Sequence, residues 1–334
     1  MRPRTSGRPQ ITDVAAAAGV SPATVSRVMN GNTTVAAALV ERVHAAAAEL
    51  GYVASPIARS LVLGRTQTVS VVVPDMANPT FQETLRGITR AAAQQRHRVL
   101  IADSAEDVTA EVELAREARR HTDALVLCAP RMPDEQLAAL VPSLAPLVLT
   151  HRRPGTGVPT ATADYRAGMV DLGEHLLGLG HRRLLYLAGP ASSTNNRLRL
   201  DGIDAVRTAH PEVEVVVRTG GVSFEDGYAA AAAVRESGAT AVMAFNDLVA
   251  MGLLGALQEA GVDVPEQVSV TGFDDIPLAR WTTPSLTTAS VANVELGALA
   301  WARLAALLAG QDPDEDVLLT PAVTVRSSTG PAPR

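Results

Sequence analysis

Between Thr68 and Asp275 the chain alternates short apolar runs with longer amphipathic segments, and this alternation restricts the fold more than any other feature. The runs VSVVV, LVLC, LLYLA and VSVTGF lack the polar alternation of a half-exposed strand. Such strands, separated by helices, are typical of parallel sheets covered on both faces. Two successive sets of them predict an α/β core of two doubly wound parallel-sheet subdomains.

Ahead of this core, residues 11–30 predict a helix, a tight turn and a second helix. Thr12 is suited to cap the first helix, and Gly19 permits the turn. Ser21 followed by Pro22 is a typical helix start. We therefore expect an all-α, helix-turn-helix head. A third helix is predicted over residues 35–51, with a buried stripe of Leu39, Val43, Ala46, Ala47 and Leu50.

The outward face of the second helix carries short side chains and one long cation, which suits entry into a DNA major groove. These residues are Pro22, Ala23, Ser26, Arg27 and Asn30. On spacing alone, an ordinary two-helix corner is the alternative. Charge favours DNA, because residues 1–65 hold seven arginines against three acidic residues and the rest of the chain is acidic.

Composition excludes several classes of function. The chain has no lysine, which removes phosphate-binding loops of the GxxxxGK type and Schiff-base enzymes, including those that use pyridoxal phosphate. No apolar run is long enough to span a membrane and no secretory signal is visible, so we expect a cytoplasmic protein. The single cysteine, Cys128, is expected to be a buried thiol. We expect neither a cofactor nor a metal.

Ligands of parallel sheets bind beyond the carboxyl ends of the strands. Carboxylates, amides and scarce aromatic residues follow the predicted strands. They include Asp75, Asn78, Phe81, Phe224, Phe245, Asn246, Phe273, Asp274 and Trp281. The aromatic residues suggest a stacking site, although each taken singly is more often simple packing. A cleft between the two subdomains is the expected binding site.

Taken together, these segments resemble transcription regulators of the lactose-repressor/galactose-repressor (LacI/GalR) family over essentially the whole chain. The matching motifs are TDVAAAAGVSPATVSRVMNG, ELGY, ARSL, HLLGLGHRR, FND, VSVTGFDD and TPSLTT. The resemblance implies a homodimer that binds a pseudo-palindromic operator with a central CG step. It also implies a periplasmic-binding-protein-like core that holds a small effector, which the polar residues of the site suggest is a mono- or oligosaccharide.

We therefore expect a DNA-binding domain over residues 1–53, a hinge helix and linker over 54–65, and an effector-binding core over 66–334. The N-subdomain is expected at about 66–163 plus 291–320, and the C-subdomain at about 164–290 plus 321–330. No leucine heptad follows Arg326, so the sequence gives no reason to expect a tetramer.

The resemblance assigns roles to individual residues of the head and the hinge. Pro22, Ala23 and Arg27 match base-reading positions, and Thr12, Ser21, Thr24, Ser26 and Asn30 match phosphate contacts. Leu61, with Ala58 one turn before it, matches the side chains that enter the minor groove.

For the effector, Arg199, Asn246 and Asp274 match the central contacts, and Asp75, Asn78, Phe81 and Asp164 match further ones. We add Phe224 and Trp281 as stacking candidates. A helix cap is the alternative role for Asp274, and a surface ion pair with Asp201 or Asp204 is the alternative for Arg199.

Two other classes of function remain open from sequence. A sugar- or nucleoside-processing enzyme could use the same cleft, although no HExxH or GxSxG motif occurs. A transport-type sugar-binding protein would share the core, but the basic head and the missing signal peptide oppose it.

Overall fold

The computed structural model describes residues 9–29, 35–53, 64–153, 155, 157–313 and 316–333. Contacts divide the chain into two units, Met1–Gln67 and Thr68–Arg334. The first contains the predicted head, and the second contains the predicted core.

The head consists of three helices, α1 (Ile11–Ala18), α2 (Pro22–Met29) and α3 (Ala37–Leu50). They bury a small core to which every helix contributes, made of Val14, Ala15, Ala18, Val25, Val28, Val43, Ala46 and Ala47. The inward face predicted for the second helix is thereby confirmed. α2 begins as predicted, because the Ser21 hydroxyl accepts a hydrogen bond from the Thr24 amide at 3.1 Å.

Three local predictions for the head were wrong. Gln10, and not Thr12, is the N-cap residue of α1, and its backbone amide donates a 2.8 Å hydrogen bond to the Asp13 carboxylate. α3 begins at Ala37, two residues late, because Ala36 offers no side-chain cap. Leu50 is 37% exposed and Leu39 is only half-buried, so neither belongs to the buried stripe.

The first sheet of the core has the strand order β11-β5-β4-β3-β1-β2, and all of its strands are parallel. Its strands are β1 (Thr68–Val73), β2 (Arg98–Asp103), β3 (Ala124–Cys128), β4 (Leu147–Thr150), β5 (Thr160–Ala163) and β11 (Val317–Leu319). The accompanying helices are α5 (Pro79–Gln94), α6 (Val108–His121), α7 (Asp134–Leu144) and α13 (Asn293–Leu308). Cys128 lies buried on β3, as predicted, and burial raises the pKa of its thiol to about 12.

The second sheet has the order β12-β10-β9-β8-β6-β7, in which only β12 runs antiparallel to its neighbour. Its strands are β6 (Arg183–Ala188), β7 (Glu214–Thr219), β8 (Ala241–Ala244), β9 (Ser269–Asp274), β10 (Thr287–Ser290) and β12 (Ala322–Thr324). The accompanying helices are α8 (Tyr165–Gly178), α9 (Thr194–Ala209), α10 (Phe224–Ala229), α11 (Ala231–Ser237), α12 (Asp247–Glu259) and the 3-10 turn η1 (Pro277–Trp281).

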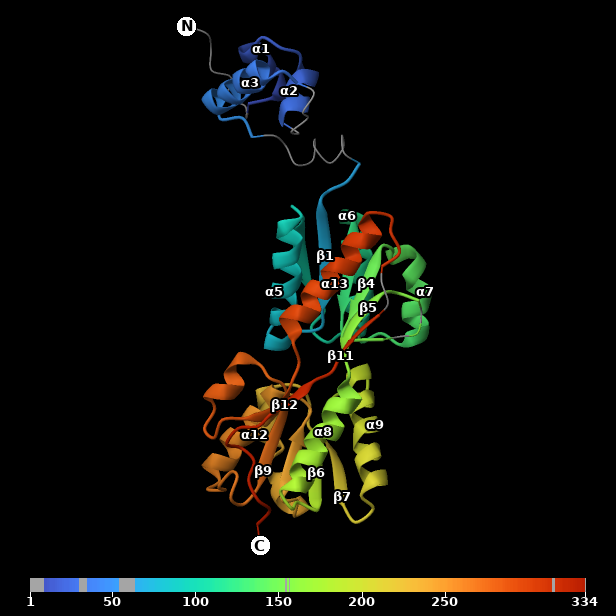
Figure 1. Cartoon of the computed structure of the whole chain (residues 1–334), viewed down its shortest axis with the longest axis vertical. Helices are drawn as coiled ribbons and strands as arrows, with labels where there is room; N and C mark the ends of the chain where they lie inside the picture. The colour runs from blue at the N-terminus through green and yellow to red at the C-terminus, as the bar shows by residue number, and fades with distance from the viewer. Residues whose placement is uncertain are drawn as a thin grey trace. The chain divides into compact units, whose positions relative to one another are not determined.

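The two sheets form two halves of the core, stacked along its long direction, and the chain passes between them after β5, β10 and β11 (Figure 1). Sequence reasoning missed β5 and β10, because their sequences TATA and TTAS carry little hydrophobic signal. The segment 224–237 forms two helices, α10 and α11, that meet at Ala230.

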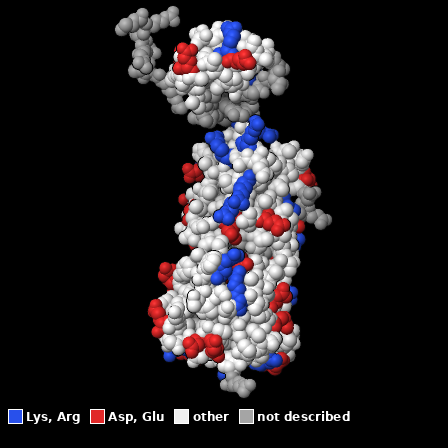
Figure 2. All heavy atoms as spheres, turned by 60° about the vertical axis from the view of Figure 1, so that its left-hand side comes forward, with Lys and Arg blue, Asp and Glu red and all other residues white. Residues whose placement is uncertain are grey.

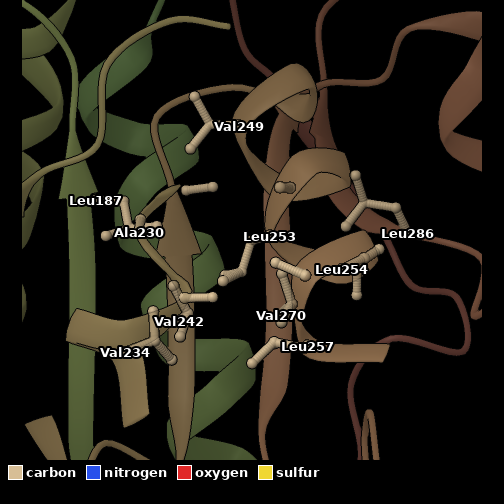
Figure 3. Packing of buried hydrophobic residues seen from close by; sticks show 14 of the residues in the cluster. Leu187, Ala230, Val234, Val242, Val249, Leu253, Leu254, Leu257, Val270 and Leu286 are labelled. Atoms are coloured by element: carbon tan, nitrogen blue, oxygen red, sulfur yellow. The ribbon is translucent and has the colours of Figure 1, made fainter. Parts of the chain in front are cut away.

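Packing on the second sheet shows why its strands are so apolar. Leu253, Leu254 and Leu257 of α12 lie against Val242 of β8 and Val270 of β9 in one dense layer (Figure 3). Strands covered in this way on both faces must be hydrophobic on both sides. The carboxyl ends of β6, β8 and β9 are thereby held rigidly where they carry polar residues.

Candidate functional site

The helix α2 presents the predicted DNA-reading residues to solvent. Pro22, Ala23 and Arg27 are exposed on the face opposite the buried Val25 and Val28. Arg27 lies beside its own helix, with its Nε 3.4 Å from the Ala23 carbonyl oxygen. Its guanidinium is therefore available to an external acceptor, as groove reading requires.

The described residues predicted to contact phosphates lie at the start of α1 and immediately before and within α2. Thr12 and Ser21 are exposed, whereas Thr24 and Ser26 are half-buried. The Ser21 and Thr24 hydroxyls share a hydrogen bond of 2.9 Å. Asn30, Ala58 and Leu61 lie outside the described residues.

In the core, a cavity is lined by residues from both halves. The lining consists of Asn78, Thr80, Phe81, Glu106, Arg131, His151, Tyr165, Ser193, Asn195, Arg199, Val222, Phe245, Asn246 and Asp274. Five of the nine predicted effector residues therefore lie together: Asn78, Phe81, Arg199, Asn246 and Asp274. They converge because they follow the carboxyl ends of β1, β6, β8 and β9.

Arg199 is the centre of this cavity. Its guanidinium carbon lies over three aromatic rings, 4.7 Å from the Tyr165 centroid, 4.5 Å from Phe245 and 4.1 Å from Phe273. Cations are attracted to the faces of aromatic rings, most strongly where water is excluded. Only 2% of Arg199 is exposed and it pairs with Asp274 at 3.5 Å, so it forms no surface ion pair with Asp201 or Asp204.

Asp274 connects the two halves of the core. Its Oδ1 faces Arg199, and its Oδ2 accepts a 2.9 Å hydrogen bond from the Thr80 hydroxyl on the other half. Burial raises the pKa of Asp274 to about 6, against the opposing influence of Arg199 and Thr80. The alternative role as a helix cap is wrong, because Asp247 accepts the Ile276 amide at the start of η1.

His151 takes part in a buried chain of hydrogen bonds that fixes its protonation. Thr84 donates its hydroxyl proton to the Thr80 carbonyl oxygen, so it accepts from His151 Nε2 at 2.9 Å. His151 Nδ1 then accepts from the Tyr165 hydroxyl at 2.6 Å. Burial lowers the pKa of His151 to about 3, which agrees with a neutral ring. The cavity thus contains a fixed, uncharged imidazole.

The two predicted asparagines also cap helices. Asn78 Oδ1 accepts the Thr80 amide at 3.0 Å, and Asn246 Oδ1 accepts the Val249 amide at 2.9 Å. Asn246 Nδ2 donates to the Val222 carbonyl oxygen at 3.0 Å. Their amide groups are therefore held in fixed orientations, and the remaining N–H groups can serve a ligand.

Four predicted effector residues do not line the cavity. Asp75 accepts the Ala77 amide in a local turn, and Asp164 caps α8 through the Ala167 amide. Phe224 is 39% exposed and Trp281 is 78% exposed. The two aromatic side chains are therefore exposed to solvent and are not part of the cavity lining.

Sequence reasoning also missed several lining residues, namely Thr80, Glu106, Arg131, His151, Tyr165, Ser193 and Asn195. The rule that ligands bind after strand ends would have found many of them, since Arg131 follows β3 and His151 follows β4. Arg131 holds Glu106 through two hydrogen bonds of 2.6 and 2.8 Å. Asn195 Oδ1 and Arg199 Nε are buried without a hydrogen-bond partner.

The surface of the described residues shows no contiguous patch of one sign in the view of Figure 2. On the core, arginines form a broken row down the middle of that face, and acidic residues lie mainly along its flanks. None of the described helices combines the length and apolar character needed to cross a membrane. Within the same residues, no group of three or more His, Cys, Asp or Glu side chains is arranged to hold a metal ion.

A helix-turn-helix head and a two-sheet, cleft-bearing core define a ligand-sensing DNA-binding protein. Residues 10–55 match the family model for bacterial regulatory proteins of the lacI family, and residues 174–329 match the periplasmic binding protein-like domain. The chain belongs to the LacI family of bacterial transcription regulators.

Individual relatives are similar to this chain over most of its length. The HTH-type transcriptional repressor CytR of Escherichia coli is 32% identical, over 90% of this chain and 89% of its own length. The structure of the Lac repressor dimer bound to operator and the anti-inducer ONPF has a TM-score of 0.89 and 28% identity, over 97% of this chain and 100% of that one. A LacI family regulator from Enterococcus faecium with bound ribose has a TM-score of 0.69 and 28% identity, over 79% of this chain and 99% of that one.

Proposed function

We propose that this protein is a transcriptional repressor whose affinity for an operator is controlled by a small polar effector, a sugar, bound between the two halves of the core. The observation that carries the proposal is the cavity centred on Arg199. A buried cation, a carboxylate and two oriented amides can donate to and accept from neighbouring hydroxyls, while the Phe81 and Phe245 rings can cover C–H groups. The bound ribose in the Enterococcus faecium relative supports a sugar.

We propose that the effector controls DNA binding by changing how the two halves of the core meet, and Thr80 and Asp274 form one contact between those halves across the cavity. An effector that binds between them has different contacts in the open and the closed core, and this difference in affinity is what shifts the equilibrium. We propose that the shift reaches the DNA through the segment 54–65, where Leu61 enters the minor groove of a pseudo-palindromic operator at a central CG step. Leu61→Ala should weaken operator binding and leave effector affinity unchanged.

We propose that the protein acts as a homodimer in the cytoplasm. The Lac repressor relative was solved as a dimer on its operator. In this chain the edge strand β2 exposes 52% of Leu100 and 45% of Ile101, and Trp281 is 78% exposed on the other half. Apolar side chains exposed on both halves fit a second copy. Sedimentation of Leu100→Asp/Ile101→Asp should show a monomer, and an unchanged dimer would contradict this placement.

We expect the effector to dissociate from the cavity without having been chemically altered. Glu106 is held by Arg131, Asp274 is held by Arg199 and Thr80, and both nitrogens of His151 are engaged. These groups are therefore arranged for recognition, and none of them is free to act as a general base. Recovery of a chemically altered sugar after incubation would favour the enzyme instead.

A single assay tests the main proposal. The DNA upstream of the gene is labelled, and its binding to the protein is followed by fluorescence anisotropy while neutral and charged sugars are added one at a time. We expect at least one compound to change operator affinity, and Arg199→Met to remove that response. Operator binding that no compound alters would contradict ligand control in this cavity.

A further inference from the structure

A second cavity, of about 420 Å³, adjoins the effector cavity, and Arg131 and Ser193 line both. The effector cavity itself leaves only about 30 Å³ free. The second cavity, here called the outer chamber, is lined by Val108, Arg131, Met132, Pro133, Asp134, Arg152, Ala191, Ser192, Ser193, Thr194 and Arg197. A sugar ring is larger than this free volume, so the core must open around the ring, and any substituent on the ring would extend into the outer chamber.

Four arginines line the two cavities, and three of them have a carboxylate partner. Arg131 pairs with Glu106 at 2.6 Å, Arg152 with Asp134 at 2.5 Å and Arg199 with Asp274 at 3.5 Å. Arg197 has no ion pair or side-chain hydrogen bond within the described part of the chain. Since His151 is neutral, the combined lining has a net charge of +1, and the unpaired charge lies on Arg197, which is exposed whereas the other three arginines are buried.

The surroundings of Arg197 also favour a negative charge. It lies in the first turn of α9, a helix of 16 residues whose N-terminus Ser193 caps through the Asn196 amide. The first amides of a helix have no acceptor within it, and the helix dipole adds partial positive charge there. Ser192 and Thr194 bring hydroxyl groups to the same wall. Asp134 is the one acidic residue among those that line the outer chamber, and it already forms an ion pair with Arg152.

Two residues that line the cavities also hold buried polar atoms without a hydrogen-bond partner among the described residues. The Nε of Arg152, a residue 2% exposed, has no hydrogen-bond partner, and neither has Oδ1 of Asn195, which is 8% exposed. Arg152 lines the outer chamber and Asn195 lines the effector cavity. A buried polar atom without a partner is costly, but a ligand would reach these two atoms only if their side chains shifted, so the charge of Arg197 carries the argument.

We propose that the effector is a sugar with an anionic substituent, a phosphate or a carboxylate, whose charged group binds Arg197 and the first turn of α9 in the outer chamber. This inference rests on the proposed function and deepens it. The ring occupies the effector cavity beside Arg199 and Asp274, and Arg131 and Ser193 lie where the two parts of the ligand join.

The test measures calorimetric affinities of the full-length protein for matched compounds. The pairs are ribose and ribose 5-phosphate, glucose and glucose 6-phosphate, and galactose and galacturonate, together with inorganic phosphate alone. Each is measured on the wild type, on Arg197→Gln and on the control Arg235→Gln. Arg235 is exposed on α11 and lines neither cavity. The phosphate and carboxylate pairs distinguish the two sources of charge.

We expect at least one anionic sugar to bind about fivefold or more tightly than its neutral parent, the gain that one well-formed ion pair gives. Arg197→Gln should abolish this preference, and Arg235→Gln should keep it. Equal or tighter binding of the neutral parents, an unchanged preference in Arg197→Gln, or no binding by any anionic sugar would overturn the inference. A neutral sugar that releases the operator would leave the proposed function standing, whereas charge-dependent binding without any effect on the operator would refute that function instead.

Discussion

Replacing Arg199 with methionine should make the stability of the core strongly dependent on pH. In the wild type Arg199 is 2% exposed and Asp274 is 6% exposed, and their charges lie 3.5 Å apart. Methionine has a similar length and packs well against aromatic rings, so it can take the place of the guanidinium among the three rings. The variant therefore removes the cation and leaves a buried carboxylate without it.

The loss of unfolding free energy in Arg199→Met depends on whether Asp274 is ionised. Breaking a buried ion pair by removing one partner costs about 3–5 kcal/mol in the free energy of unfolding. Asp274 keeps its hydrogen bond from Thr80, so we expect the lower end, about 3 kcal/mol, at pH 7.5. Protonation of Asp274 removes the unpaired charge, and at pH 5 we expect a loss of about 1 kcal/mol or less.

The direction of this pH dependence follows from proton linkage. Burial already raises the pKa of Asp274 to about 6, and Arg199 opposes that rise, so the variant's pKa is higher still. A carboxyl group with a higher pKa in the folded state binds its proton more tightly when folded. Its contribution to stability is complete below the unfolded-state pKa and is lost as the pH rises through the folded-state pKa. The penalty of the variant therefore grows between about pH 5 and 7.5.

Urea unfolding at pH 5, 6 and 7.5 measures the effect. Trp301 is 2% exposed within the core and reports its unfolding by fluorescence. Arg235→Met, at an exposed position of α11, is the matched control and should show no comparable pH dependence. Adding Asp274→Asn to Arg199→Met should remove the pH dependence. An equal loss of stability at pH 5 and pH 7.5 would refute the reasoning.

Four further predictions concern packing and the head. A Cβ on Gly87 would lie 2.0 Å from the Val294 carbonyl oxygen, so Gly87→Ala should lower core stability by about 2–3 kcal/mol in urea titrations. Gly255→Ala, in α12 with no atom within 4 Å of its Cβ, should instead raise it by about 0.5–1 kcal/mol. Ser21→Ala removes the cap of α2 and should cost the head about 1 kcal/mol, seen as a lower thermal midpoint of its helical signal. Arg27→Gln should weaken operator binding by about 1–3 kcal/mol and affect random DNA much less, and equal losses on both DNAs would assign Arg27 to the phosphates.

Local patterns in the sequence predicted most of the secondary structure. Alternating apolar and amphipathic segments gave the two parallel sheets, because a strand covered on both faces must be hydrophobic throughout. Ser21 and Pro22 marked the start of α2 because helix starts depend on a few neighbouring residues. The strands β5 and β10 were missed because Thr and Ala alone do not distinguish a buried strand from a loop.

The candidate site was only partly predictable, because convergence is a property of topology. Strand ends pointed to Asp274 and Asn246, but they equally pointed to Asp75 and Phe224, and periodicity cannot say which loop turns inward. The resemblance to a known family narrowed that choice, but it did not exclude Asp164 or find Arg131.

The sequence by itself determined the class of protein, a basic helical head on an α/β core, because charge and hydrophobic periodicity are local quantities. The tertiary structure decided the chemistry of the cavity. It set the protonation of His151 through Tyr165 and Thr84, and it joined Thr80 to Asp274, which are 194 residues apart. It also left Arg197 as the cation without a partner among the described residues that line the two cavities. Burial and pairing of charges depend on every element that packs around them, and no single stretch of the chain contains that information.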